Sequence, residues 1–196
     1  MDNQLDAAYW SKRYENNDAA WDVGEVSAPL KKYIDGLQDR NIAILIPGCG
    51  NAYEAEYLLQ KGFTNITLVD YSAVLVKAIE HKFQAHVGKE LTVICSDFFD
   101  LSSTFDLIVE QTFLSALHPS LRTKYAEKMH ALLNENGSLA GVIFNKVFEG
   151  GPPFGGTQQE YQQLFAPLFS IEIMEPCYNS IEPRKGAELF IRLRKI

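Results

Sequence analysis

Two glycines flank a cysteine in the turn Gly48-Cys49-Gly50, which follows a short apolar run over 42–47. Glycine lets the backbone turn sharply and approach a ligand closely, so this turn predicts a ligand site at the end of a buried strand. A dinucleotide fingerprint needs a third glycine where this chain has Tyr53, and a phosphate-binding loop needs a Gly-Lys-Ser/Thr sequence that does not follow. A purely structural tight turn is the alternative interpretation.

Two carboxylates follow the next two predicted strands. Asp70 ends the apolar run over 66–69, where a carboxylate can accept from both ribose hydroxyls of an adenosine. Asp97 precedes Phe98, a pair that can accept from the adenine amino group and stack on the ring. The alternatives are a helix cap shared with Ser72 for Asp70 and an ordinary loop carboxylate for Asp97. Two acids at an adenosine, without phosphate-binding apparatus, point to S-adenosylmethionine.

Aromatic side chains are concentrated in the N-terminal segment, residues 1–30. Trp10 and Tyr14 are one helical turn apart and share a face, whereas Trp21 lies in a stretch without helical pattern. Aromatic faces attract cations, so these rings suit the positive sulfur of S-adenosylmethionine. We expect this segment to be a lid that is mobile without cofactor and ordered with it, and packing of a helix on the sheet is the alternative for Trp10 and Tyr14.

Methyl transfer is an in-line displacement, so the protein must mainly hold the nucleophile, the methyl group and the sulfur in line in a dry pocket. Glu110 is the one candidate general base in the sequence, but a carboxylate that orients the ammonium group of the cofactor is the preferred role for it. The four histidines have no partner ligands at suitable spacing, so no metal is expected. The residues expected around the methyl acceptor are Phe113, Phe144, Asn145 and Phe154.

Apolar runs alternate with helical patterns along the chain. Parallel strands are predicted at 42–47, 66–69, 91–95, 105–109 and 138–144. Helices are predicted between them, including one from Ser72 to Gly88 and one over 119–133 before the Asn136-Gly137 turn. After a short helix over 158–165, strands at 169–174 and 188–193 are predicted to form an antiparallel hairpin. The pattern predicts an α/β fold with a seven-stranded, mostly parallel, doubly wound sheet.

Size and composition fit a single domain over residues 1–196, because 46% of the residues are hydrophobic and 22% are charged. The formal net charge of -7 disfavours DNA or RNA as a partner. No stretch predicts a signal peptide or a membrane span, and three distant cysteines suit a reducing compartment. We expect a cytoplasmic protein, a monomer or weak homodimer, that acts on a small molecule without nucleic-acid or membrane partners.

Several of these motifs together resemble the thiopurine methyltransferase-like family, and within it the plant and microbial thiol and halide methyltransferases. The resemblance runs from about Tyr9 to the C-terminus. It is carried by Trp10, Trp21-Asp22-x-Gly24, Ile46-Pro47-Gly48-Cys49-Gly50, Val69-Asp70-Tyr71-Ser72, Gly150-Gly151-Pro152-Pro153 and Pro183-Arg184-Lys185-Gly186. The resemblance implies the class I methyltransferase fold with S-adenosylmethionine as cofactor. It implies cofactor contacts from Trp10, Tyr14, Trp21, Gly48, Asp70, Asp97, Phe98 and Gln111, beside the Gly50 of the same turn.

The chain departs from these relatives at positions that bear on the acceptor. Tyr14 stands where the plant enzymes have a tryptophan, and Gln111 where they have a tyrosine. Phe144 and Phe154 also replace tyrosines, so two hydroxyl donors to an anion are absent. We therefore expect a soft nucleophile as the methyl acceptor, with a thiol or hydrosulfide ahead of a halide.

Three other functions remain open from the sequence. The chain could be an oxygen or nitrogen methyltransferase for a small metabolite, with Glu110 as base. It could bind S-adenosylmethionine or S-adenosylhomocysteine without catalysis. A nicotinamide-dependent oxidoreductase rests on analogy of fold alone.

Overall fold

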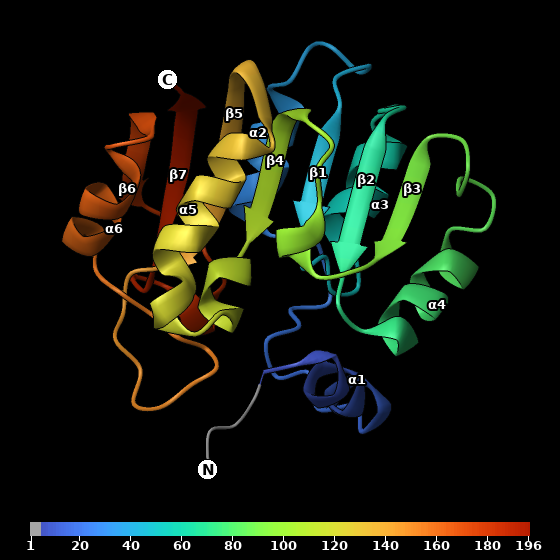
Figure 1. Cartoon of the computed structure of the whole chain (residues 1–196), viewed down its shortest axis with the longest axis horizontal. Helices are drawn as coiled ribbons and strands as arrows, with labels where there is room; N and C mark the ends of the chain where they lie inside the picture. Colours follow the sequence, from blue (N-terminus) through green and yellow to red (C-terminus); the bar gives the residue numbers. More distant parts are fainter. Residues whose placement is uncertain (1–4) are drawn as a thin grey trace.

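The computed structural model of this chain describes residues 5–196 and contains one seven-stranded sheet with the order β3-β2-β1-β4-β5-β7-β6 (Figure 1). The first five strands pair in parallel, and β7 is antiparallel to both β5 and β6. The strands are β1 Ile44–Pro47, β2 Ile66–Asp70, β3 Leu91–Cys95, β4 Phe105–Gln111, β5 Leu133–Phe144, β6 Phe169–Pro176 and β7 Glu188–Lys195. The predicted doubly wound sheet and its C-terminal antiparallel hairpin are confirmed.

Helices cover both faces of the sheet, because its central strands are apolar on both sides. One face packs against α2, α3 and α4, and the other against α5 and α6; in Figure 1, α5 lies in front of the sheet and α2 and α3 behind it. The α-helices are α1 Ala7–Glu15, α2 Ala28–Asp35, α3 Tyr53–Gln60, α4 Ala73–Lys82, α5 Arg122–Ala131 and α6 Gln158–Phe165. Short 3₁₀ turns are η1 Phe98–Asp100, η2 Phe113–Ala116, η3 Pro119–Leu121 and η4 Glu182–Arg184.

The segment between α5 and β5 differs from its prediction. The helix predicted over 119–133 begins as the 3₁₀ turn η3, and its last residue already pairs in the sheet, where Leu133 lies opposite Phe105. Asn136 adopts a left-handed conformation with φ 62°, and the register shifts between Phe105 and Leu107. The Asn-Gly signal therefore marks an irregularity inside a long strand, because sheet pairing continues through it.

The topology brings the carboxyl ends of the parallel strands to one edge of the sheet, and α1 lies beyond that edge (Figure 1). Helix α1 is tied to α4 by a 3.0 Å hydrogen bond between the hydroxyl groups of Ser11 and Ser72. Ser72 also caps α4, since its hydroxyl accepts from the Leu75 N–H at 3.3 Å, as predicted for the helix start. The site is therefore built from strand ends, the turns after them, and the N-terminal helix.

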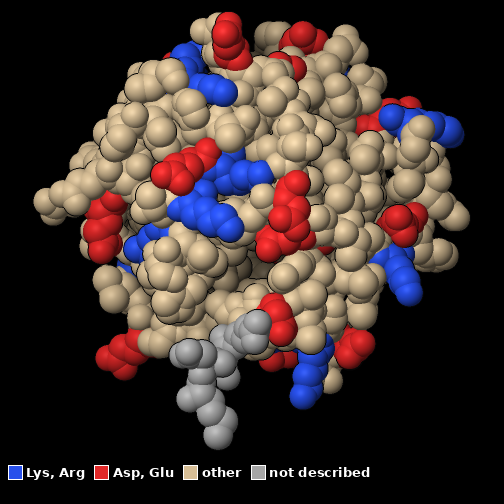
Figure 2. Space-filling view, viewed as in Figure 1, with Lys and Arg blue, Asp and Glu red and all other residues tan. Residues whose placement is uncertain are grey.

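Charged side chains of both signs are interspersed on the face that Figure 2 shows, without a continuous basic stripe on that face. In residues 5–196, no helix is long and apolar enough to cross a bilayer.

Candidate active site

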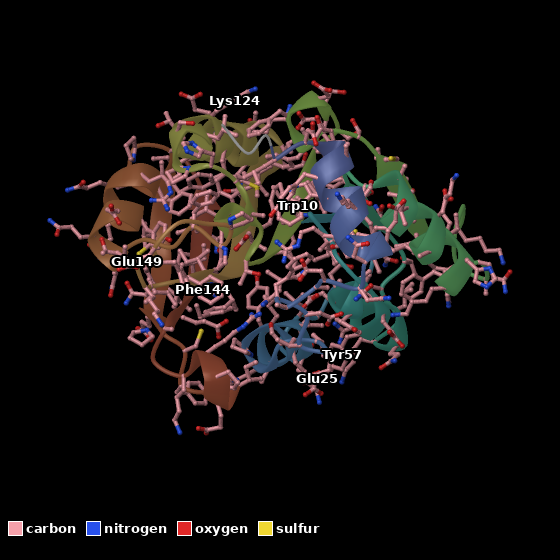
Figure 3. All side chains as sticks on the ribbon, turned by 90° about the horizontal axis from the view of Figure 1, so that it is seen from below. Trp10, Glu25, Tyr57, Lys124, Phe144 and Glu149 are labelled. Atoms are coloured by element: carbon pink, nitrogen blue, oxygen red, sulfur yellow. The ribbon has the colours of Figure 1, made fainter. Side chains whose placement is uncertain are left out.

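A cavity of about 1140 Å³ lies at the carboxyl ends of the parallel strands, beneath α1. Figure 3 is seen from this end, with Trp10 of α1 near the middle of the view and Phe144 to its left. The cavity brings together most of the residues selected from the sequence. Those that line it are Trp10, Tyr14, Trp21, Gly48, Gly50, Asp70, Asp97, Phe98, Gln111, Phe113, Phe144 and Phe154.

The glycine turn after β1 requires its glycines for conformation and, at Gly48, for space. Gly48 and Gly50 have φ values of 55° and 51°, in the left-handed region. A Cβ on Gly48 would lie 2.2 Å from Cδ2 of Phe113, so the phenyl ring occupies the space that a side chain would need. Burial raises the pKa of the Cys49 thiol between them, which fits a packing residue better than a nucleophile.

Asp70 ends β2 beside this turn. Its Oδ1 accepts from the Ser72 N–H at 2.9 Å, and its side chain lines the cavity. Burial raises the pKa of Asp70 to about 6, while the backbone N–H groups of Ser72, Gly50 and Tyr71 oppose that rise. Because Ser72 itself caps α4, Asp70 is not needed as the helix cap, and its carboxylate can accept hydroxyl donors from a ligand.

Asp97 and Phe98 stand after β3, the strand that pairs with β2. The Asp97 side chain accepts from the Phe99 N–H at 2.9 Å and so caps the turn η1, while it also lines the cavity. Phe98 is only 5% exposed, and its ring packs edge-on against Phe99 and Phe113 at centroid distances of 5.3 and 5.2 Å. The pair can bind a flat heterocycle with an amino group at the cavity wall.

The aromatic residues of the N-terminal segment form one cluster over the cavity. The ring of Trp21 packs edge-on against Trp10 and Tyr14, with centroids 5.6 and 5.8 Å apart. The Arg13 guanidinium lies 4.7 Å from the centroid of the Trp21 ring. Trp10 and Tyr14 of α1 line the cavity, and Tyr14 also packs against the core cluster on one face of the sheet. Residues 1–4 of the predicted lid lie outside the described part of the chain.

The side chains of Tyr14 and Gln111, the two remaining predicted cofactor contacts, are positioned by neighbouring residues. Burial, together with the nearby Asp70 carboxylate, raises the pKa of the Tyr14 hydroxyl. A Cβ on Gly50 would lie 3.8 Å from this hydroxyl, which places Tyr14 over the glycine turn. The Gln111 Oε1 accepts from the Ser27 hydroxyl at 2.7 Å, which leaves the amide N–H groups of Gln111 for a ligand.

Sequence reasoning assigned no role to Asp22 and Arg184, although both belong to motifs that it used. Asp22 accepts hydrogen bonds from the Asn51 side-chain amide and, at 3.2 Å, from the Tyr53 hydroxyl. Arg184 donates to the Trp21 carbonyl at 2.6 Å and forms a 3.3 Å ion pair with the buried Glu188. These bonds fix the segment that follows α1 to the rest of the domain. Arg184 and Trp21 are more than 100 residues apart in the sequence, so no local sequence pattern could have predicted their contact.

We expect Arg184→Met to loosen this segment. The substitution removes the donor to the Trp21 carbonyl, so cleavage near Trp21 by chymotrypsin should become several-fold faster and S-adenosylhomocysteine should protect less. Lys185→Met is the matched control, because the one ion pair of Lys185 within residues 5–196 is with the exposed Glu182. Equal cleavage of both variants, with and without S-adenosylhomocysteine, would contradict the lid interpretation.

Glu110 and Asn145 do not line the cavity, contrary to the placement expected for them. Glu110 is completely buried on β4, and its Oε1 accepts from the Leu114 N–H at 2.8 Å, behind the turn that forms the cavity wall. Asn145 is turned toward α6, where its Oδ1 accepts from the Gln158 N–H at 2.9 Å. Side chains alternate across a strand, so a residue at a strand end can serve the core and not the site.

Comparisons with known proteins identify the family of this chain. A family model described as thiopurine S-methyltransferase (TPMT) matches residues 5–191. "Probable thiol methyltransferase 2" of Arabidopsis thaliana is 29% identical over 192 residues, covering 95% of this chain and 84% of that protein. "Thiopurine S-methyltransferase" of Vibrio vulnificus (strain YJ016) is 25% identical over 196 residues, covering 91% and 90%.

A solved structure shares the fold at low sequence identity. The 1,6-didemethyltoxoflavin-N1-methyltransferase of Burkholderia thailandensis, solved with S-adenosylhomocysteine, has a TM-score of 0.74 at 19% identity and covers 96% of this chain and 86% of that one. The family match extends over nearly all described residues. The chain therefore belongs to the thiopurine S-methyltransferase (TPMT) family and is a methyltransferase that uses S-adenosylmethionine.

Proposed function

We propose that this enzyme transfers the methyl group to a small soft nucleophile, with a thiol or hydrosulfide as the first choice. The observation that carries this proposal is the chemistry of the wall formed by residues 111–121 and 144–154. Four phenylalanines line it, namely Phe113, Phe144, Phe148 and Phe154, together with the basic side chains of His118 and Lys146. No Asp or Glu within those two ranges lines the cavity. Such a wall suits an uncharged or weakly hydrated acceptor that needs no strong base.

The opposite side of the cavity fits the cofactor. The glycine turn permits close approach, and the carboxylates of Asp70 and Asp97 can accept from ribose hydroxyls and from an adenine amino group. The rings of Trp10, Tyr14 and Trp21 would face the cationic sulfur. S-adenosylmethionine supplies an activated methyl group on a sulfonium, so the protein itself need not form a covalent intermediate.

The protein's contribution to the reaction is orientation and exclusion of water. The lid aromatics and the loop around Phe154 enclose the space between the two sides, and the Phe154 N–H donates to the Ser115 carbonyl at 2.7 Å to hold that loop on η2. A small thiol with a pKa near 8.5 is a few per cent thiolate at neutral pH, so it reacts without a dedicated base. Phenylalanines at 144 and 154 offer no hydroxyl donor to a halide, which places halides behind thiols.

Two observations bear on the competing functions. The relatives named for thiol and thiopurine S-methyl transfer support a sulfur acceptor. An oxygen or nitrogen acceptor would need a base; Glu110, the candidate chosen from the sequence, is completely buried outside the cavity, so that function would have to use another side chain of the wall, such as His118. A cytoplasmic location and a monomeric or weakly dimeric state stay predictions.

The test is incubation with methyl-labelled S-adenosylmethionine and separate acceptors, with trapping of volatile products. The panel is hydrosulfide, small thiols, thiocyanate, iodide, bromide and chloride. We expect product from hydrosulfide and thiols, with the halides well below them. Binding of the cofactor without turnover of any acceptor in the panel would reject the proposal and favour a larger acceptor or a binding role.

The pH dependence of the two acceptor classes should differ, because in the proposed reaction the thiol ionises in solution and the thiolate reacts without an enzyme base. From pH 6.5 to 7.5, the rate with a thiol of pKa near 8.5 should rise about 10-fold with the thiolate fraction. Thiocyanate is an anion at both pH values, so its rate should change little. A steep rise with thiocyanate as well would indicate an enzyme group that titrates in this range.

A further inference from the structure

Glu110 is a buried acid for which methyl transfer has no direct use. It lies on the central strand β4 with 0% exposure, and its backbone packs so closely on β5 that a Cβ on Gly141 would lie 2.6 Å from Cβ of Glu110. One carboxyl oxygen accepts from the Leu114 N–H at 2.8 Å. The other has no hydrogen-bond partner among the described residues. Burial of a carboxyl group with an unpaired oxygen lowers the free energy of unfolding, so a residue of this kind is expected to have a function.

The chain between Glu110 and Leu114 forms a strained turn. Thr112 has φ 57°, a left-handed conformation that a β-branched residue rarely adopts. Its N–H donates to the Val142 carbonyl at 3.0 Å, and the Ser115 N–H donates to the Thr112 carbonyl at 3.1 Å. Among the backbone groups of this turn, the Leu114 N–H donates to the Glu110 carboxyl group, at 2.8 Å, and the N–H groups of Phe113 and Thr112 lie near enough to lower the Glu110 pKa. The acid therefore supplies the acceptor that the tight turn would otherwise lack.

This turn places Phe113 against both halves of the cofactor side. The Phe113 ring fills the space above Gly48, where a Cβ would lie 2.2 Å from Cδ2 of the ring. The same ring packs edge-on against Phe98, with centroids 5.2 Å apart. A change in the turn would therefore move the surfaces of the glycine turn and of the Phe98 wall together.

We infer that Glu110 is a positioning residue for cofactor binding, whose carboxyl group holds the turn at 112–116 so that Phe113 supports Gly48 and Phe98. The role is indirect, since Glu110 itself does not line the cavity. The inference depends on the cofactor and not on the choice of acceptor, so it can fail or succeed independently of the proposed thiol reaction.

The protonation state of the Glu110 carboxyl group is determined by its burial and by the groups around it. Burial raises the pKa of Glu110 to about 8, although the backbone N–H groups of the turn oppose the rise. The titratable groups that face it are Tyr125 of α5 and Tyr161 of α6, both neutral in this range, and the Tyr125 hydroxyl is also without a partner among the described residues. The neighbouring strand segments, 44–47 and 140–142, contain no titratable side chain. Glu110 is therefore mostly neutral near pH 7. Above pH 8 its charge faces no cation among residues 5–196, so we expect water to enter and the turn to loosen.

The experiment measures the Kd of S-adenosylhomocysteine by calorimetry at pH 7.0 and pH 9.5 for wild type, Glu110→Gln and Glu110→Leu. The Gln amide keeps the oxygen acceptor and cannot ionise. We expect Gln to bind within about 3-fold of wild type at pH 7.0, and Leu about 10-fold or more weakly, because the turn loses its acceptor. From pH 7.0 to 9.5, wild type should lose up to about 30-fold more affinity than Gln, the limit set by a pKa near 8.

Two results would overturn the inference. One is an equal change of Kd with pH for wild type and for Glu110→Gln. Ionisation of the ligand affects both proteins alike, so it cancels in this comparison. The other is a Gln variant that binds no better than Glu110→Leu at pH 7.0. Thermal unfolding of each variant checks that it is folded, and if Leu does not fold, the comparison of Gln with wild type across pH still decides.

Discussion

Replacement of Asp70 with alanine is expected to weaken the binding of S-adenosylhomocysteine by about 150-fold or more. Hydrogen bonds to a charged acceptor are worth about 1.5–3 kcal/mol each, and two ribose hydroxyls would lose theirs together. Calorimetric titration measures the effect directly. Asp100→Ala is the matched control, because Asp100 is exposed and does not line the cavity. Similar losses in the two variants would show that the effect does not come from the site.

The pH dependence of binding gives a second measurement on Asp70. With its pKa raised to about 6, roughly a tenth of Asp70 is ionised at pH 5, so affinity should fall about 10-fold between pH 7.5 and pH 5. Asp70→Asn should remove this dependence, since an amide does not titrate. Together with Glu110, the wild type is expected to show a bell-shaped profile whose two limbs are abolished by different substitutions.

Stability should change in the opposite direction from binding. The folded-state pKa of Asp70 lies above its ordinary value of 3.8, so the stability linked to its proton is fully present below that value and is lost as pH rises to about 6. Above pH 6 the buried carboxylate costs on the order of 2–3 kcal/mol. Asp70→Asn should therefore unfold at a higher temperature than wild type at pH 8, by roughly 5–10 °C. Weaker binding with greater stability is typical of a residue kept for function.

The fold was predictable because local signals and tertiary packing agree along most of the chain. Apolar runs covered on both faces gave the parallel strands, and Ser72 began α4 as its cap. Helix α2 was not predicted from the sequence, although two features indicate it. Pro29 lies in its first turn, and the apolar residues Leu30 and Ile34, which are four residues apart, are both buried. Its short length and weak contrast with the flanking polar residues concealed it.

The candidate site was predictable for those functional residues that directly follow a parallel strand. Asp70, Asp97 and the glycine turn follow strands of one parallel sheet, so topology alone brings them to one edge. The direction in which a side chain projects was harder to predict at Glu110, the last but one residue of β4, and at Asn145, which follows β5; both lie at that edge of the sheet but outside the cavity. The pairing of β4 with β5 shifts register between Phe105 and Leu107, and the left-handed conformation of Thr112 turns the chain after β4; sequence periodicity predicts neither feature.

Gly48→Ala is expected to lower the free energy of unfolding by about 2–5 kcal/mol, the sum of left-handed strain and a forced contact with Phe113. Gly48 has φ 55°, and its added Cβ would lie 2.2 Å from Cδ2 of the Phe113 ring. For a chain of this size the loss corresponds to roughly 5–15 °C in the unfolding temperature. Binding of S-adenosylhomocysteine should also be lost, because the ring can move only by displacing the turn that Glu110 holds.

Two further variants separate strain from contact. Gly88→Ala has the same kind of backbone strain, with φ 78°, but its Cβ would meet no atom within 4 Å, so it should cost about 1–2 kcal/mol only. Adding Phe113→Ala to Gly48→Ala removes the contact, and the double variant should lose less stability than the sum of the two single variants. If Gly48→Ala and Gly88→Ala are equally mild, the Phe113 ring moves aside freely. The turn at 112–116 would then not be rigid, and the positioning role of Glu110 would lose its physical basis.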